Sequence, residues 1–178
     1  MKAHPIIAIL GSGTTKENSQ DWRIAYQIGF LLAKAGFRIV NGGYHGIMEA
    51  SAKGALDAGG KTIGITAREF GSSKANPYIQ KEMRMKRYPD RLFKLIDIAD
   101  AFVFLNGGTG TIVEMSVVLE MIHKGFLSKP TVILGKRMQR LIQFIRHFPD
   151  VSVSDLLVFR SNPKAAAQLL EKIFFRSR

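Results

Sequence analysis

The segment from Asn106 to Glu114, Asn-Gly-Gly-Thr-Gly-Thr-Ile-Val-Glu, carries the residues best suited to chemistry in this chain. It follows the apolar run at residues 101–105 and opens a helix-like pattern. Small residues at a strand-to-helix turn leave backbone N–H groups free to bind an anion, which the positive end of the helix dipole also favours. We therefore predict a phosphate site made by Gly107, Gly108, Thr109, Gly110 and Thr111.

Glu114 stands about one helical turn beyond these small residues. Its negative charge would repel a phosphate, so the carboxylate must serve another part of the ligand. In a nucleoside 5′-phosphate, the ribose and its glycosidic carbon lie next to the phosphate. A carboxylate there can stabilise an oxocarbenium-like transition state or activate water, as glycosidase carboxylates do. An acid placed near a helix start only to match the dipole is the alternative.

Two further glycine turns follow apolar runs, one at Gly11-Ser12 and one at Gly42-Gly43. The first is an incomplete G-x-G-x-x-G, because Lys16 stands in the place of the last glycine, so it indicates a dinucleotide site only weakly. Glycine lets a ligand approach the backbone closely, and it also permits tight turns. We predict that both turns line the ligand site, with a purely structural role as the alternative.

Arg91 lies in the first turn of a predicted helix, after Pro89 and Asp90. A cation there is disfavoured by the helix dipole by ~0.3–1 kcal/mol. We interpret Arg91 as a residue that holds an anion or a substrate hydroxyl, with an ion pair to Asp90 as the alternative. The four histidines show no metal-ligand spacing and cysteine is absent, so no metal site is predicted.

Short apolar runs alternate with amphipathic segments along the whole chain. Strands are predicted at residues 6–10, 37–40, 62–66, 101–105, 131–134 and 156–159, and helices at 19–35, 46–58, 89–98, 109–124, 138–147 and 161–175. This alternation predicts an α/β protein, one Rossmann-like domain over residues 1–178, with a doubly wound parallel sheet and helices on both faces. Residues 67–85 are expected to form the longest irregular connection, a candidate flap.

Composition limits the classes of function. The chain has 178 residues and a formal net charge of +12. No apolar run is long enough to span a membrane, and no signal-peptide pattern is present, so a cytoplasmic protein is expected. Residues 81–94 hold six Lys or Arg residues and two acids. Anionic small molecules or nucleic acid would both be attracted by such charge, and a nucleic-acid-binding module is therefore one alternative.

Together these residues resemble the lonely-guy (LOG) family of Rossmann-like dimers, which cleave the N-glycosidic bond of nucleoside 5′-monophosphates. The family signature is P-G-G-x-G-T-x-x-E, and an arginine precedes its glutamate by about 23 residues. Arg91 lies at that spacing, and the signature is matched by Gly107, Gly108, Gly110, Thr111 and Glu114. A second family motif, G-G-G-x-x-G-L-M-G, is echoed by residues 41–49.

The resemblance implies a phosphoribohydrolase that releases a free base and ribose 5-phosphate from AMP or a cytokinin riboside monophosphate. It implies that Arg91 orients the substrate and Glu114 is catalytic, that no cofactor is required, and that the protein is a homodimer or a higher homo-oligomer. The chain departs from the family at Asn106, Leu92 and Val113. These departures favour an alternative, a non-catalytic carrier of a phosphorylated cofactor such as the molybdenum cofactor.

Overall fold

The computed structural model describes residues 4–71, 74–148 and 156–175. Its strands form one sheet in the order β4-β3-β2-β1-β5-β6-β7, and every neighbouring pair is parallel. The strands are β1 (Ile6–Leu10), β2 (Arg38–Asn41), β3 (Lys61–Ala67), β4 (Lys81–Met85), β5 (Ala101–Phe104), β6 (Thr131–Ile133) and β7 (Leu157–Phe159). The predicted doubly wound parallel sheet is confirmed.

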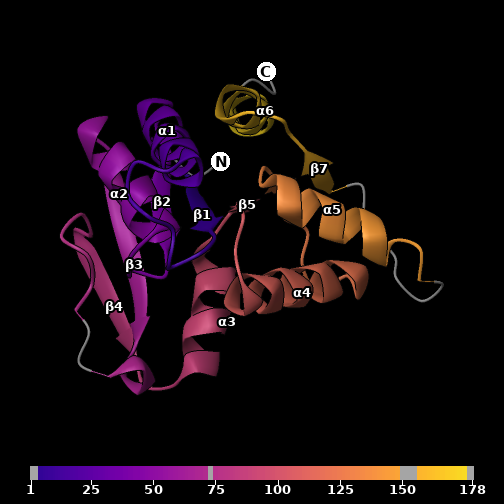
Figure 1. Cartoon of the computed structure of the whole chain (residues 1–178), viewed down its shortest axis with the longest axis horizontal. Helices are drawn as coiled ribbons and strands as arrows, with labels where there is room; N and C mark the ends of the chain where they lie inside the picture. The colour runs from indigo at the N-terminus through magenta and orange to yellow at the C-terminus, as the bar shows by residue number, and fades with distance from the viewer. Residues whose placement is uncertain (1–3, 72–73, 149–155, 176–178) are drawn as a thin grey trace.

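Helices cover both faces of this sheet (Figure 1). They are α1 (Gln20–Lys34), α2 (Ile47–Asp57), α3 (Tyr88–Ile98), α4 (Thr109–His123), α5 (Lys136–Ile145) and α6 (Pro163–Phe175), with a short 3-10 turn, η1 (Arg68–Phe70). Residues of α1, α2 and α6 share one apolar core with the sheet, and residues of α3, α4 and α5 share the other. No helix in the described part of the chain is long and apolar enough to cross a membrane.

Burial on both faces explains the apolar strands. In β1, Ile7 and Ile9 point into the core beneath α1, while Ile6, Ala8 and Leu10 belong to the core beneath α4. All five residues of β1 are buried, as expected for a central parallel strand. The sequence-based bounds of the elements agree with the structure to within two residues, apart from one region.

That region is residues 67–85, where the prediction of an irregular connection was wrong. The segment contains the end of β3, the turn η1 and the edge strand β4, Lys-Glu-Met-Arg-Met. Charged side chains on an edge strand discourage pairing with another chain, and they also hide the strand from a search for Ile, Val and Phe. The missed strand matters because its end leads directly into α3.

The chain reverses its direction of winding between β1 and β5, which are neighbours in the sheet. In open α/β sheets a ligand binds at the carboxyl ends of the strands at such a point. Here the loops after the two strands are joined, because the Ser12 N–H donates a 3.0 Å hydrogen bond to the Asn106 carbonyl. The Ile47 N–H donates to the Ser12 carbonyl at 2.9 Å, which brings the start of α2 to the same place.

Candidate functional site

A cavity of about 460 Å³ opens at this point, between the carboxyl ends of β1 and β5. Its wall is made by the turn after β1, the start of α4, and side chains from α2, α3 and η1. The lining residues are Leu10, Gly11, Ser12, Gly13, Thr14, Tyr44, Met48, Phe70, Tyr88, Arg91, Gly108, Thr109, Gly110, Thr111 and Glu114. Both residues predicted to be catalytic therefore face the same space as most of those predicted to bind the ligand.

The N-terminus of α4 forms one end of the cavity. Gly108 is the N-cap, and no side chain caps the helix there. The next residues, Thr109 and Gly110, are exposed, whereas Thr111 is buried. Backbone N–H groups in a first helical turn have no partner within the helix, and together with the dipole they favour an anion. This end of the cavity can hold a phosphate.

Arg91 and Glu114 form a buried ion pair in the wall of the cavity. The Arg91 Nη1 lies 3.3 Å from the Glu114 Oε1, and the two residues are only 5% and 7% exposed. The Arg91 Nε donates a 2.9 Å hydrogen bond to the Ile65 carbonyl at the end of β3. Asp90, the alternative partner for Arg91, is paired with Arg87 instead at 2.8 Å. The guanidinium is thus held from two sides and points inward.

Burial raises the pKa of the Glu114 carboxyl above its usual value of 4.5, and the facing Arg91 guanidinium opposes part of that rise. The Tyr88 hydroxyl borders the same space, and its pKa is raised by burial and by the Glu114 charge. A carboxyl with a raised pKa inside a cavity is typical of a residue that exchanges protons or faces developing positive charge. The arrangement therefore suits Glu114 to chemistry beside a bound phosphate.

Three of the glycines predicted to bind the ligand do not line the cavity, namely Gly42, Gly43 and Gly107. Two of them make room for residues that do. A Cβ on Gly42 would lie 1.9 Å from the Arg91 Nη2, and a Cβ on Gly107 would lie 2.1 Å from the Thr111 Oγ1. At both glycines, the group that comes close to the backbone is therefore a side chain of the protein and not a ligand.

Gly43 serves the turn after β2. Its φ is +78°, its N–H donates to the Asn41 Oδ1 at 2.8 Å, and its carbonyl accepts from the Asn76 N–H at 2.7 Å. The Asn41 Nδ2 also donates to the Met48 carbonyl at 2.8 Å. Asn41, which stands where the resembling family has glycine, therefore ties the turn to α2.

Sequence reasoning missed the aromatic residues of the site. Tyr44, Phe70 and Tyr88 surround the Arg91 guanidinium, whose carbon lies 5.9, 5.8 and 5.9 Å from their ring centres. Phe70 also contacts the rings of Tyr44 and Tyr88, at 5.8 and 5.5 Å between ring centres. The only signal in the sequence was that Tyr44 directly follows Gly43 and that Tyr88 lies three residues before Arg91. Nothing marked Phe70.

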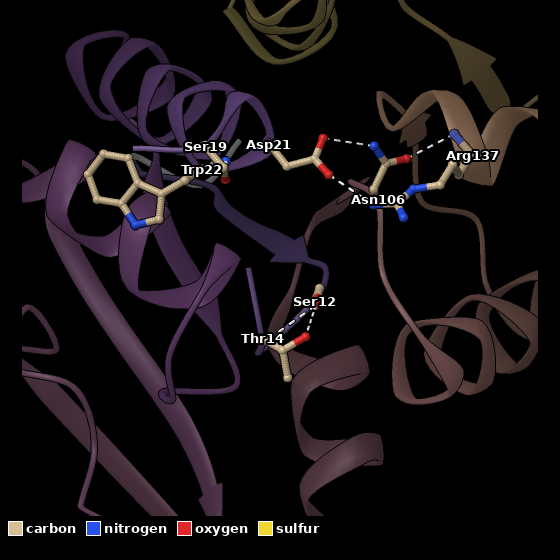
Figure 2. Close-up of polar contacts among 7 residues, drawn as sticks. All are labelled: Ser12, Thr14, Ser19, Asp21, Trp22, Asn106 and Arg137. Carbon is tan, nitrogen blue, oxygen red and sulfur yellow. Dashed lines mark hydrogen bonds and ion pairs between the residues drawn. The ribbon is translucent and has the colours of Figure 1, made fainter. Parts of the chain in front are cut away.

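Asn106, which stands in the place of the family's proline, is at the centre of a polar network (Figure 2). Its Nδ2 donates to the Asp21 Oδ1 at 2.8 Å, and its Oδ1 accepts from the Arg137 N–H at 2.9 Å. The Arg137 Nη2 closes the network on the Asp21 Oδ2 at 3.0 Å. The departure thus links the loop after β5 to the starts of α1 and α5.

The other departures have simple structural settings. Leu92 lies in the core beneath α3, and Val113 is exposed on α4.

Ser12 and Thr14 share a 3.0 Å hydroxyl hydrogen bond at the cavity, as Figure 2 shows. Within the described ranges, no group of three or more His, Asp or Glu side chains could hold a metal ion.

Comparisons with known proteins find relatives in sequence and in fold. A cytokinin riboside 5′-monophosphate phosphoribohydrolase of Rhodococcoides fascians is 30% identical over 130 residues, which cover 70% of this chain and 66% of that protein. The molybdenum cofactor binding protein of Rippkaea orientalis has a similar fold, with a TM-score of 0.78 at 24% identity, over 96% of this chain and 97% of that one.

The molybdenum cofactor carrier protein of Chlamydomonas reinhardtii is also similar, with a TM-score of 0.71 at 22% identity, over 96% of this chain and 98% of that one. At such identities the two structures establish the likeness of the fold. The SLOG cluster4 family matches residues 4–149, a range that contains every residue of the cavity wall. The chain belongs to the SLOG cluster4 family.

Proposed function

We propose that this protein hydrolyses the N-glycosidic bond of a nucleoside 5′-monophosphate, AMP or a cytokinin riboside monophosphate. The observation that carries the proposal is the position of Glu114, a buried carboxyl with a raised pKa in a cavity that also holds an open helix N-terminus. The Rhodococcoides fascians relative, whose name describes this reaction, supports the proposal.

The residues divide the work along the cavity. The first turn of α4 holds the 5′-phosphate through backbone N–H groups, with the Thr109 and Thr111 hydroxyls beside it. Arg91 orients the ribose and offsets negative charge. As the bond between C1′ and the base nitrogen breaks, the Glu114 carboxylate stabilises the positive charge on the sugar or takes a proton from the attacking water. Water oxygen bonds to C1′, the base leaves with a proton, and ribose 5-phosphate is the other product.

The direct test is release of free base. Purified protein is incubated with AMP or isopentenyladenosine monophosphate, and base and ribose 5-phosphate are followed by liquid chromatography. We expect equal amounts of both products from the wild type and a severe loss with Glu114→Gln. Glu49→Gln is the matched control. Glu49 ends the Asn-Gly-Gly segment at residues 41–49, as Glu114 ends the one at residues 106–114, but it does not line the cavity. Intact nucleotide after prolonged incubation with folded wild type would contradict the proposal.

A second candidate is a carrier of the molybdenum cofactor, a phosphorylated pterin. The departures at Asn106, Leu92 and Val113 and the two structural relatives favour it. The cavity fits such a ligand in part, because the start of α4 would hold its phosphate and the rings of Tyr44 and Phe70 would lie against its pterin. The protein would then hold the cofactor without catalysing a reaction of its own.

Expression in a host that makes the cofactor separates the two candidates. The carrier function predicts pterin fluorescence in the purified protein, retained in Glu114→Gln, and no base release from AMP. The hydrolase function predicts base release and no copurified pterin. Pterin-free protein that releases base would exclude the carrier.

A further inference from the structure

A second hollow, of about 690 Å³, lies next to the cavity and is rich in positive charge. Its lining consists of Arg68, Glu69, Arg84, Lys86 and Arg87. These residues come from η1, from β4 and from the connection that leads into α3. Three of the six cations at residues 81–94 thus gather with Arg68 around one depression.

Much of this charge is available to a ligand. The single acid of the lining, Glu69, accepts a 2.7 Å hydrogen bond from the Tyr88 N–H and so caps the start of α3. Arg87 is paired with Asp90, and the Arg84 Nη2 donates to the Gly71 carbonyl at 2.9 Å. Over residues 4–71, 74–148 and 156–175, the structure pairs neither Arg68 nor Lys86 with a carboxylate.

Protection of the sheet edge explains only part of this cluster. Charges along β4 discourage edge-to-edge pairing, and Arg84 serves that purpose. Arg68 belongs to η1 and Arg87 is the N-cap of α3, so neither is part of the edge strand. Four cations against one acid leave an excess of positive charge around the hollow, which attracts an anion.

The hollow and the cavity are connected by two pairs of chain neighbours. Glu69 and Arg87 line the hollow, while their chain neighbours Phe70 and Tyr88 line the cavity. The rings of Phe70 and Tyr88 lie with their centres 5.5 Å apart, and Phe70 is 48% exposed. A ligand that extends out of the cavity along this part of the chain would reach the cationic hollow.

We propose that the hollow is a second phosphate subsite, so that the ligand of this site is a nucleoside 5′-phosphate carrying a further phosphate, such as a 5′-phosphorylated dinucleotide. The inference rests on the proposed function, which places the 5′-phosphate at the start of α4. Exposed aromatic rings close to cationic sites bind successive nucleotides, because bases stack on rings while cations hold the phosphates. Arg68 and Lys86 contact the second phosphate.

Isothermal titration calorimetry with AMP and with the 5′-phosphorylated dinucleotide pApA tests the subsite. All proteins carry Glu114→Gln so that the ligand is not consumed. The test variant adds Arg68→Ala and Lys86→Ala, neither of which breaks an ion pair described in the structure. The control variant adds Arg140→Ala and Lys164→Ala, which remove the same charge from exposed positions on α5 and α6.

We expect pApA to bind about tenfold more tightly than AMP at low salt, with a salt dependence steeper by about one counterion. In the test variant, the affinity for pApA should fall to within about twofold of the affinity for AMP. The affinity for AMP should stay unchanged, since the removed cations contact only the second phosphate. The control variant should keep the preference for pApA.

The subsite proposal would be overturned if pApA bound no more tightly than AMP, or if both variants lowered the preference equally. Either result with AMP still bound leaves the hydrolase proposal standing. A preference for pApA in the titration, together with no base release from AMP by the wild type, would support the subsite and count against the hydrolase. Absence of any AMP binding would remove both proposals.

Discussion

Two turns in this protein have nearly the same sequence and opposite surroundings. Residues 41–49 and 106–114 both read Asn-Gly-Gly, three variable residues, Ile, one variable residue and Glu. Both follow a strand and lead into a helix. In the first, Ile47 is fully buried and Glu49 is partly exposed, whereas in the second Ile112 is 37% exposed and Glu114 is buried. The same pattern therefore places its carboxylate outside the cavity in one case and inside it in the other.

The two helices begin at different positions of this shared pattern. Helix α2 begins at Ile47, so Glu49 lies in its first turn, where it faces His45 at 3.5 Å. Helix α4 begins at Thr109, three pattern positions earlier, so Glu114 lies in its second turn. A shift of three positions is close to one full helical turn and moves a side chain by about 4.5 Å along the axis. The two glutamates thus stand at different distances from the starts of their helices.

The two helix starts also differ in what they offer a ligand. The first N–H of α2, from Ile47, is already bonded to the Ser12 carbonyl, and Gly46 packs against the same backbone with its Cβ position 2.4 Å from that oxygen. At α4 nothing lies within 4 Å of a Cβ built on Gly108 or Gly110. The first turn is filled by protein, and the second is open to an anion.

Exchange of the two glutamates for glutamine should give the largest contrast. We expect Glu114→Gln to lower base release by about 10²–10⁴-fold, the usual contribution of a carboxylate that acts in the reaction. Glu49→Gln should change it by less than about twofold, because Glu49 does not face the cavity. Initial rates with AMP measure both. Equal losses would show that the two turns do not differ in function.

Alanine at the second glycine of each turn should separate them in stability. Gly43 has a φ of +78°, and its Cβ would lie 2.8 Å from the Thr66 Cγ2, so Gly43→Ala combines strain with a clash. We expect a loss of about 1–3 kcal/mol in the free energy of unfolding. Gly108 has a φ of −95° and open space around it, so Gly108→Ala should stay within about 0.5 kcal/mol. Urea unfolding followed by circular dichroism compares them, and a similar loss in both would refute the difference in packing.

Removal of the two asparagine side chains should sharpen the comparison further. Asn41 is fully buried, and Asn41→Ala leaves the Gly43 N–H without its acceptor, at a cost of about 1–3 kcal/mol. Asn106 is partly exposed, and Asp21 keeps its ion pair with Arg137, so Asn106→Ala should cost about 0.5–1.5 kcal/mol. Thermal unfolding gives the order. A greater loss at Asn106 would mean that the network of Figure 2 stabilises the fold more than the buried turn does.

The smallest expected effect is on pH dependence. Burial raises the pKa of Glu114 in the folded protein above 4.5, so the protonated form is favoured on folding. The stability of the wild type relative to Glu114→Gln should then be greatest below that pH and should fall as pH rises through the raised pKa. Base release, which needs the carboxylate, should rise over the same interval. Melting temperatures at a series of pH values check the first statement, and a constant difference between the two proteins would contradict it.

The fold could be read from the sequence because its signals are local and repeated. Apolar runs of Ile, Val and Phe bounded by glycine, alternating with helical patterns, predicted six of the strands and the six helices near their observed bounds. The strand β4 was missed because three of its five residues are charged, as suits a strand at the edge of a sheet. Apolar patterning reports burial, and an edge strand has little of it.

For the candidate site, residue types and spacing indicated Arg91, Glu114 and the glycines and threonines at positions 107–111. A helix N-terminus with a nearby acid can be recognised from local sequence alone. Only the tertiary structure decided which glycines face the ligand and which make room for Arg91 and Thr111. It alone brought Phe70 to the cavity and gathered the cations of three segments into one hollow. Local sequence determines how a turn or helix forms, but which side of it meets empty space depends on contacts between residues far apart in the chain.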